Sequence, residues 1–80
     1  MNENEIRAAV SEVIADVLTL PRDGVTPQAH FYDDLGGDSM QKLEVIAHLE
    51  ARFNIRFTDE EAAAGDTVEA LSLQVVRHAS

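Results

Sequence analysis

The stretch of this sequence best suited to chemistry is a serine that follows two glycines and an aspartate, Gly36-Gly37-Asp38-Ser39. The glycines let the backbone turn sharply. Asp38 is a strong helix N-cap because its carboxylate accepts a hydrogen bond from a free N–H group of the first turn. Ser39 then takes the first helical position, where the helix carries about half a positive charge and free N–H donors. A phosphodiester on the Ser39 hydroxyl would lie in a favourable field, although the tetrapeptide alone favours the simpler interpretation of a turn and a cap.

The helix expected after this serine carries more apolar surface than a helix that serves only a core. It begins at Asp38-Ser39, extends to about Arg52 or Phe53, and contains no Gly or Pro. At about 100° per residue, one side is the core face of Val45, Ile46, Leu49 and Phe53 and the opposite side is polar, with Gln41, His48 and Arg52. A further apolar strip consists of Met40, Leu43 and Ala47, with Glu44 and Glu50 near its edges. Such a strip suits contact with a partner groove that has basic edges, and burial of all three apolar residues is the alternative.

The elements that must position this serine are also predicted to be helices. Apolar residues at helical spacing predict a first helix that Asn2 or Asn4 caps and Pro21 ends; they are Ile6, Val10, Val13, Ile14, Val17 and Leu18. The segment from Leu20 to Gly37 is punctuated by Pro and Gly and predicts a long loop. We expect three residues of this loop to anchor it in the core: Phe31, Tyr32 and Leu35.

Two more helices complete the predicted fold. A short third helix fits Asp59 to Ala63, with Thr58 or Asp59 as its cap and Gly65 at its end. The fourth extends from about Thr67 to His78, and Asp66 and Glu69 stand at capping-box spacing at its start, although the box prefers Ser or Thr at its first position. No segment alternates as a strand does. The prediction is therefore an all-α, four-helix bundle of three main helices and one short helix, forming one domain over residues 1–80.

The charge balance restricts the classes of partner. Fifteen acidic and six basic residues give a formal net charge of −9 at pH 7. This excludes a nucleic-acid-binding surface and an anionic membrane, and it favours partners with positive patches, although acidity can also serve solubility alone. The acidic N-terminus is unlike a targeting segment, no apolar run could span a membrane, and cysteine is absent. We therefore expect a cytoplasmic protein.

Matches along nearly the whole chain carry a family resemblance. They are Phe31-x-x-x-Leu35-Gly36-x-Asp38-Ser39-Met40, Leu43, Glu44, Leu49-Glu50-x-x-Phe53, Phe57-x-Asp59-Glu60-Glu61 and Thr67-Val68. This pattern resembles the acyl and peptidyl carrier proteins. The resemblance implies that Ser39 carries 4′-phosphopantetheine, which a phosphopantetheinyl transferase delivers from coenzyme A. Acyl or aminoacyl groups would then be held as thioesters on the thiol of the arm.

The resemblance also implies the roles of neighbouring residues and the partners. Asp38 would position Ser39, and Met40, Glu44, Ala47 and Glu50 would contact partner enzymes. These would be an acyl- or aminoacyl-loading enzyme and an acyltransferase, ketosynthase or condensation enzyme. Family members more often have Leu or Ile where Met40 stands. The Gly36-Gly37 pair is more typical of peptidyl and specialised-metabolism carriers, and Lys42 and His48 replace residues that are often acidic in fatty acid carriers. These departures favour a polyketide or nonribosomal peptide pathway.

Other functions fit the sequence less well. Gly37-Asp38-Ser39 matches the Gly-Asp-Ser nucleophile of some esterases, but their Asp-x-x-His pairing is absent because Val75 stands three residues before His78. Leu35 and Gly37 interrupt any calcium loop that begins at Asp33. The histidines at 30, 48 and 78 lack metal-ligand spacing and are expected at the surface or at helix ends. We therefore predict a non-catalytic, free-standing, monomeric carrier without a metal. The remaining alternative is an acidic interaction module without a prosthetic group.

Overall fold

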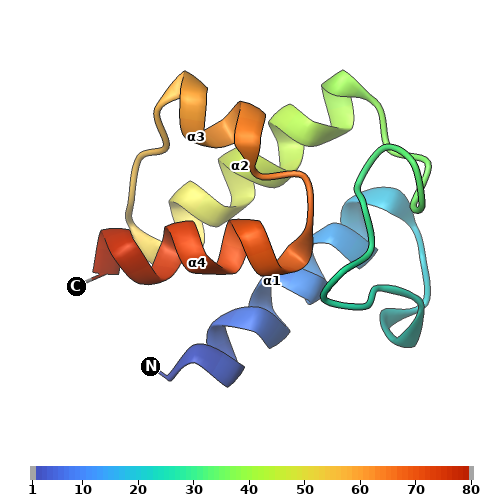
Figure 1. Ribbon diagram of the computed structural model, residues 1–80, viewed down its shortest axis with the longest axis horizontal. Helices are drawn as coiled ribbons and strands as arrows, with labels where there is room; N and C mark the ends of the chain where they lie inside the picture. Colours follow the sequence, from blue (N-terminus) through green and yellow to red (C-terminus); the bar gives the residue numbers. More distant parts are fainter. Residues whose placement is uncertain (1, 80) are drawn as a thin grey trace.

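A computed structural model describes residues 2–79 of the chain. Its elements are, in order, α1 (Glu3–Leu18), the 3-10 turn η1 (Arg22–Gly24), α2 (Ser39–Phe53), α3 (Asp59–Ala64) and α4 (Val68–Ala79). Figure 1 shows α4 crossing in front of α1, with the long connection between α1 and α2 looping over one end of the molecule. The predicted all-α fold of three long helices and one short helix is confirmed. The turn η1 inside the long connection was not predicted.

Short polar side chains set the start of the first three helices. The Asn2 side chain accepts a hydrogen bond from the Glu5 N–H (2.8 Å) and so caps α1, as one of the two predicted alternatives. Asp38 and Gln41 form a reciprocal capping box at α2, and Thr58 and Glu61 form another at α3. These contacts satisfy backbone N–H groups that have no partner inside the helix.

The first two helices end without glycine. Thr19 and Asn54 close α1 and α2 in the left-handed conformation, with φ angles of 58° and 54°. Asparagine adopts this conformation more readily than threonine, whose β-branched side chain is crowded there. Pro21, two residues after Thr19, prevents the helix from resuming.

The start of α4 differs from the sequence prediction. The Thr67 hydroxyl accepts the Ala70 N–H (3.0 Å), so Thr67 takes the capping role. The Asp66 carboxylate instead binds Lys42, and Glu69 binds Arg7 of α1 at 3.0 Å. The predicted Asp66–Glu69 capping box was wrong because both carboxylates are drawn into ion pairs with residues distant in the sequence.

The core lies between α1, α2 and α4. Its fully buried side chains come from these three helices and from one residue of the connection: Val10, Ile14, Phe31, Val45, Leu49, Val68, Leu71 and Val75. The predicted core faces of α1 and α2 are thus confirmed, with Val17, Leu18 and Phe53 packed at the periphery. Apolar burial of this kind is the main favourable term in folding. The short helix α3 has no buried residue and is held by its caps and by α4.

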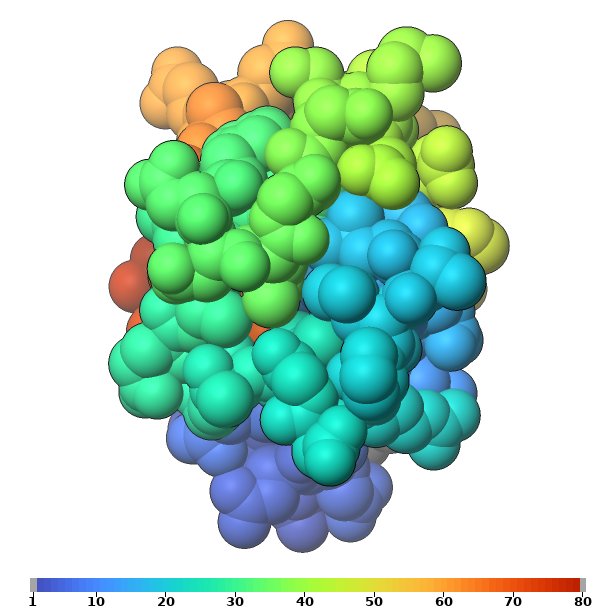
Figure 2. Space-filling model, turned by 90° about the vertical axis from the view of Figure 1, so that its right-hand side faces the viewer, coloured from blue at the N-terminus to red at the C-terminus, as the bar shows by residue number. Residues whose placement is uncertain are grey.

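The connection from Leu20 to Asp38 is pinned at its second half. Phe31 is 1% exposed and enters the core, and Leu35 packs against it, as predicted. Tyr32 was expected in the core as well, but it remains 37% exposed and stacks edge-on against the Phe31 ring, with 5.2 Å between centroids. Residues 31–35 form a tight turn in which the Asp34 and Leu35 N–H groups donate to the His30 carbonyl, and this turn directs Phe31 into the core while Tyr32 stays at its surface. Figure 2 shows the connection, in cyan to green, covering much of this end of the molecule beneath the start of α2.

Candidate cofactor-attachment site

Ser39 is the first residue of α2 and is exposed to solvent. Asp38 accepts the Gln41 N–H through its side chain (2.8 Å) and the Lys42 N–H through its carbonyl (2.9 Å). In the part of the chain that the structure describes, the Ser39 hydroxyl has no hydrogen-bond partner, and neither do the N–H groups of Ser39 and Met40. The structure therefore presents a free hydroxyl beside two free donors at the positive end of a helix.

Two glycines shape the backbone that leads into this serine. Gly36 has a φ of +73°, in the left-handed region that glycine enters at little cost. Gly37 lies against the Phe31 ring, so closely that an added Cβ would be 2.3 Å from Cε2. The Gly37 N–H also donates to the Phe31 carbonyl (2.9 Å). Gly36 is thus required for its dihedral angle, and Gly37 is required for close packing against Phe31.

The apolar strip predicted on α2 lies at the surface. Met40 and Leu43 are 72% and 66% exposed, and Ala47 is exposed as well. Their burial was the alternative left open by the sequence, and the structure excludes it. Glu44 is exposed at the edge of this strip, whereas Glu50 is half-buried and its carboxylate accepts the Phe57 N–H at 2.9 Å. Glu50 therefore also holds the segment that follows α2.

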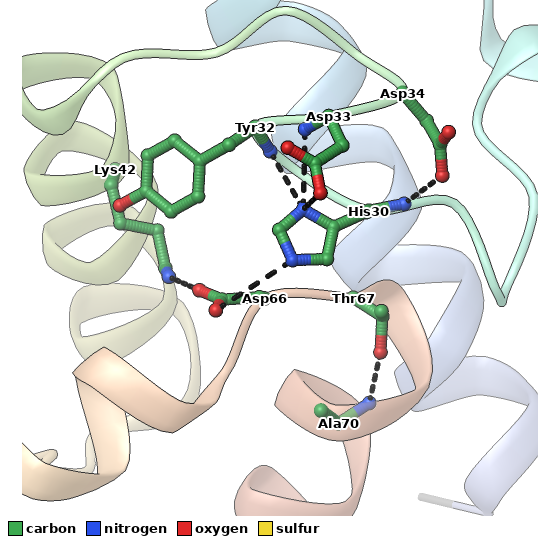
Figure 3. A network of polar contacts seen from close by, with 8 residues as sticks. All are labelled: His30, Tyr32, Asp33, Asp34, Lys42, Asp66, Thr67 and Ala70. Atoms are coloured by element: carbon green, nitrogen blue, oxygen red, sulfur yellow. Dashed lines mark hydrogen bonds and ion pairs between the residues drawn. The ribbon is translucent and has the colours of Figure 1, made fainter.

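Lys42, one turn below Ser39, is buried, which the sequence prediction missed. Its side chain is 7% exposed, and its Nζ lies 2.9 Å from an Asp66 carboxylate oxygen. The same Nζ lies 5.5 Å and 5.4 Å from the ring centroids of Phe31 and Tyr32, within cation–π range. Figure 3 shows Lys42 reaching from α2 to the segment that joins α3 to α4. Its spacing was a usable signal, because residue 42 continues the stripe of 45, 46, 49 and 53.

Two of the three histidines, His30 and His78, make structural contacts within residues 2–79. His48 is exposed, as expected, but His30 is half-buried and its Nδ1 accepts the N–H groups of Tyr32 and Asp33 at 3.2 Å. His78 lies on Phe57 and contacts the Glu61 carboxylate at 2.9 Å. The hydrogen bond from the Thr58 N–H is the main cause that lowers the pKa of the Glu61 carboxyl, and the contact with His78 lowers this pKa further. Among the described residues no set of three His, Asp or Glu side chains could hold a metal ion, and no helix is long and apolar enough to cross a membrane.

Comparison with known proteins decides the family of this chain. Residues 8–75 match the family described as "Phosphopantetheine attachment site". The chain belongs to this family of carrier proteins. It is 40% identical over 78 residues to an acyl carrier protein of Rubrobacter xylanophilus. The matched region covers 98% of this chain and 96% of that protein. It is 39% identical over 69 residues to an acyl carrier protein of Thermosynechococcus vestitus, covering 86% of this chain and 85% of the other.

A solved structure agrees with this assignment. The structure of the acyl carrier protein from Enterococcus faecalis superimposes on this carrier protein with a TM-score of 0.81 and 31% identity, covering 98% of this chain and 99% of that one. The chain is thus a member of the acyl carrier protein family and a non-catalytic carrier with covalently attached 4′-phosphopantetheine. Its partners include a phosphopantetheinyl transferase and acyl-handling enzymes.

The residues at the start of α2 fit the phosphate of such a group. Its oxygens accept hydrogen bonds, and the Ser39 and Met40 N–H groups are donors that lack an acceptor in the described chain. The other serines of the carrier protein suit attachment less. Ser72 is 3% exposed and donates to the Val68 carbonyl, Ser11 is half-buried on α1, and Ser80 lies outside the described residues.

Proposed function

We propose that Ser39 is the residue of this acyl carrier protein that bears the phosphopantetheine arm. The observation that carries the proposal is the free, exposed hydroxyl at the first position of α2, beside two N–H groups without acceptors. In the attachment step the Ser39 oxygen forms a bond to the pantetheine-side phosphorus of coenzyme A. The pyrophosphate bond breaks, adenosine 3′,5′-bisphosphate leaves, and the hydroxyl proton is released. The transferase catalyses this step, since no base contacts the Ser39 hydroxyl within residues 2–79.

The bound arm supplies a thiol on which acyl or aminoacyl groups are held as thioesters. The chain's own contribution is presentation of the serine. Asp38 fixes the first turn of α2 by its capping box and so sets the direction of the Ser39 side chain. The first-turn donors offset the charge of the phosphodiester.

The proposal includes a docking face on α2. Met40 and Ala47 would contact the partner enzymes through apolar surface, and Glu44 and Glu50 would meet basic residues at the edges. The exposure of Met40 and Glu44 supports this assignment. Glu50 is the weaker member because its carboxylate is engaged by the Phe57 N–H. Complementary charges at the rim of an interface mainly raise the association rate.

We assign the cargo to a polyketide or nonribosomal peptide pathway in the cytoplasm, where coenzyme A is available. The partners would then be a loading enzyme and an acyltransferase, ketosynthase or condensation enzyme. Support comes from the Gly36-Gly37 pair, Met40 and His48. Lys42, a further departure from the acidic pattern, is buried and so leaves the surface charge of α2 little changed.

Attachment is tested by coexpression with a promiscuous phosphopantetheinyl transferase and measurement of the intact mass. The proposal predicts a gain of one phosphopantetheinyl group for the wild type and for Ser11→Ala, and no gain for Ser39→Ala. An unmodified wild type, or a Ser39→Ala variant that still gains the mass, would refute it. Circular dichroism of Ser39→Ala provides the folding control, since an exposed first-turn serine contributes little packing.

The pathway is tested separately by the mass of the species on the arm in native cells. An aminoacyl group or a polyketide intermediate would support the assignment. A series of saturated chains that grows by two carbons to long fatty acyl groups would place the protein in fatty acid synthesis and overturn it.

A further inference from the structure

An ion pair between a buried lysine and a half-buried aspartate lies one turn below the proposed attachment serine. Lys42 is the fourth residue of α2, and its neighbours Met40 and Leu43 are among the most exposed apolar residues. Lysine is almost never fully buried unless it is paired. Here the Lys42 Nζ bonds to the Asp66 carboxylate at 2.9 Å and is covered by the Phe31 and Tyr32 rings. The pair therefore joins the first turn of α2 to the α3–α4 connection.

Asp66 is a hub for three segments that surround the serine. Its carbonyl accepts the Phe31 N–H at 2.6 Å, which fixes the segment that leads into α2. Its carboxylate binds Lys42 and lies 3.8 Å from the His30 Nε2. Figure 3 shows the three side chains converging on this point from three segments of the chain. Loss of the contact between the Asp66 carboxylate and Lys42 would release α2 from the α3–α4 connection. The hydrogen bond from the Phe31 N–H to the Asp66 carbonyl would remain.

We propose that Lys42 and Asp66 form a positioning pair that holds the serine-bearing end of α2 in the conformation that the transferase binds. This inference rests on the proposed attachment at Ser39. Both residues act through the placement of α2 relative to the segment of residues 30–37, and neither touches the reacting oxygen. The ion pair between Arg7 of α1 and Glu69 of α4, at 3.0 Å, gives a matched control because it joins two helices other than α2.

The proposed role has a distinct kinetic signature. When the pair is broken, the end of α2 populates conformations that the transferase does not bind, so the binding-competent fraction falls. Apparent affinity falls by the same factor, while the bound complex is unchanged. We therefore expect KM for the carrier to rise by about threefold to tenfold in Lys42→Met, with kcat within about twofold of the wild type. A residue that only stabilises the fold would lower the melting temperature without raising KM.

The experiment measures phosphopantetheinyl transfer to full-length apo-protein at a temperature where every variant is folded. Lys42→Met keeps the length of the buried side chain and removes its charge. Asp66→Asn removes the opposite charge, and the double variant completes a thermodynamic cycle. Arg7→Met makes the same kind of change at the ion pair between α1 and α4. Should Lys42→Met fail to fold, the KM of Asp66→Asn tests the inference instead. The Asp66 side chain is 32% exposed and therefore tolerates substitution better than the buried Lys42.

The inference predicts that Lys42→Met and Asp66→Asn raise KM to a similar extent and that the double variant adds little. Arg7→Met keeps the wild-type KM even if its melting temperature falls. Unchanged KM in both variants of the Lys42–Asp66 pair would overturn the inference, and so would an equal rise in Arg7→Met. Failure of the wild type to accept the arm is a different result, which overturns the attachment at Ser39 and with it this inference.

Discussion

Gly37→Ala is the substitution whose consequence follows most directly from the packing around the serine. A Cβ at this position would lie 2.3, 2.6 and 2.8 Å from three atoms of the Phe31 ring. Ordinary contacts begin at 3.4 Å, so the ring or the backbone must shift by about 1 Å. Phe31 is 1% exposed and packed on by Tyr32, which leaves little space for that shift. The expected result is a strained loop.

The magnitude follows from this geometry. Overpacking of a well-packed core costs about 1–3 kcal/mol, and the involvement of three ring atoms places Gly37→Ala in the upper half of that range. For a chain of this size each kcal/mol lowers the melting temperature by about 4–8 °C, so a decrease of roughly 10–20 °C is expected. Urea unfolding monitored by circular dichroism measures the free energy directly.

Two other glycines supply the controls. Gly24 has only the Pro21 Cδ within range, at 3.9 Å, and its φ is ordinary, so Gly24→Ala should be neutral or stabilising by about 0.4–1 kcal/mol. Gly36 has open space but a φ of +73°, so Gly36→Ala should cost about 1 kcal/mol through the backbone alone. A Gly37→Ala variant as stable as Gly24→Ala would refute the packing argument.

Three further predictions concern the cap, the charge and the pH response. Asp38→Ala should cost about 1 kcal/mol of unfolding free energy by removing the α2 cap, whereas Asp38→Asn should keep most of it; equal stability of the two variants in urea would contradict this. Glu44→Lys should raise KM for arm transfer at low salt and leave helicity intact, while Asp23→Lys, the same charge change in η1, should not; unchanged kinetics would place the docking face elsewhere. The lowered pKa of Glu61 means that its charged form stabilises the fold above the ordinary value of 4.5 and that this contribution disappears as the pH falls through the lowered pKa. Wild type should therefore be more stable than Glu61→Gln above pH 4.5, and this difference should disappear as the pH falls through the lowered pKa, with Glu60→Gln as the control in the same turn; a difference that stays constant as the pH is lowered into strong acid would contradict the assignment.

Local signals in the sequence were sufficient for the helices and for the position of Ser39 at the start of α2. The cap residues Asn2, Asp38 and Thr58 act over three residues, and the spacing of the core residues repeats along each helix. The position of the apolar strip that begins at Met40 also followed from helical geometry, whereas its exposure was one of two alternatives that the structure decided. These features depend on contacts between residues close together in the chain, which is why the sequence predicts them.

The features that were missed depend on contacts between distant residues. Lys42 lies on the core stripe of α2, but its partner Asp66 is 24 positions away in the sequence. The sequence therefore did not indicate which carboxylate would compensate the charge of a buried Lys42. The same ion pair removed Asp66 from the predicted cap of α4 and left Thr67 in that role. Tyr32 shares the hydrophobicity of Phe31, and only the direction of the loop decides which ring enters the core.

Peptide mapping by tandem mass spectrometry after incubation with coenzyme A and a phosphopantetheinyl transferase tests the central claim most directly. The account predicts one phosphopantetheinyl group, located on Ser39, with Ser11 and Ser72 unmodified. A group on any other residue would contradict the account, as would complete absence of the group from the Ser39 peptide.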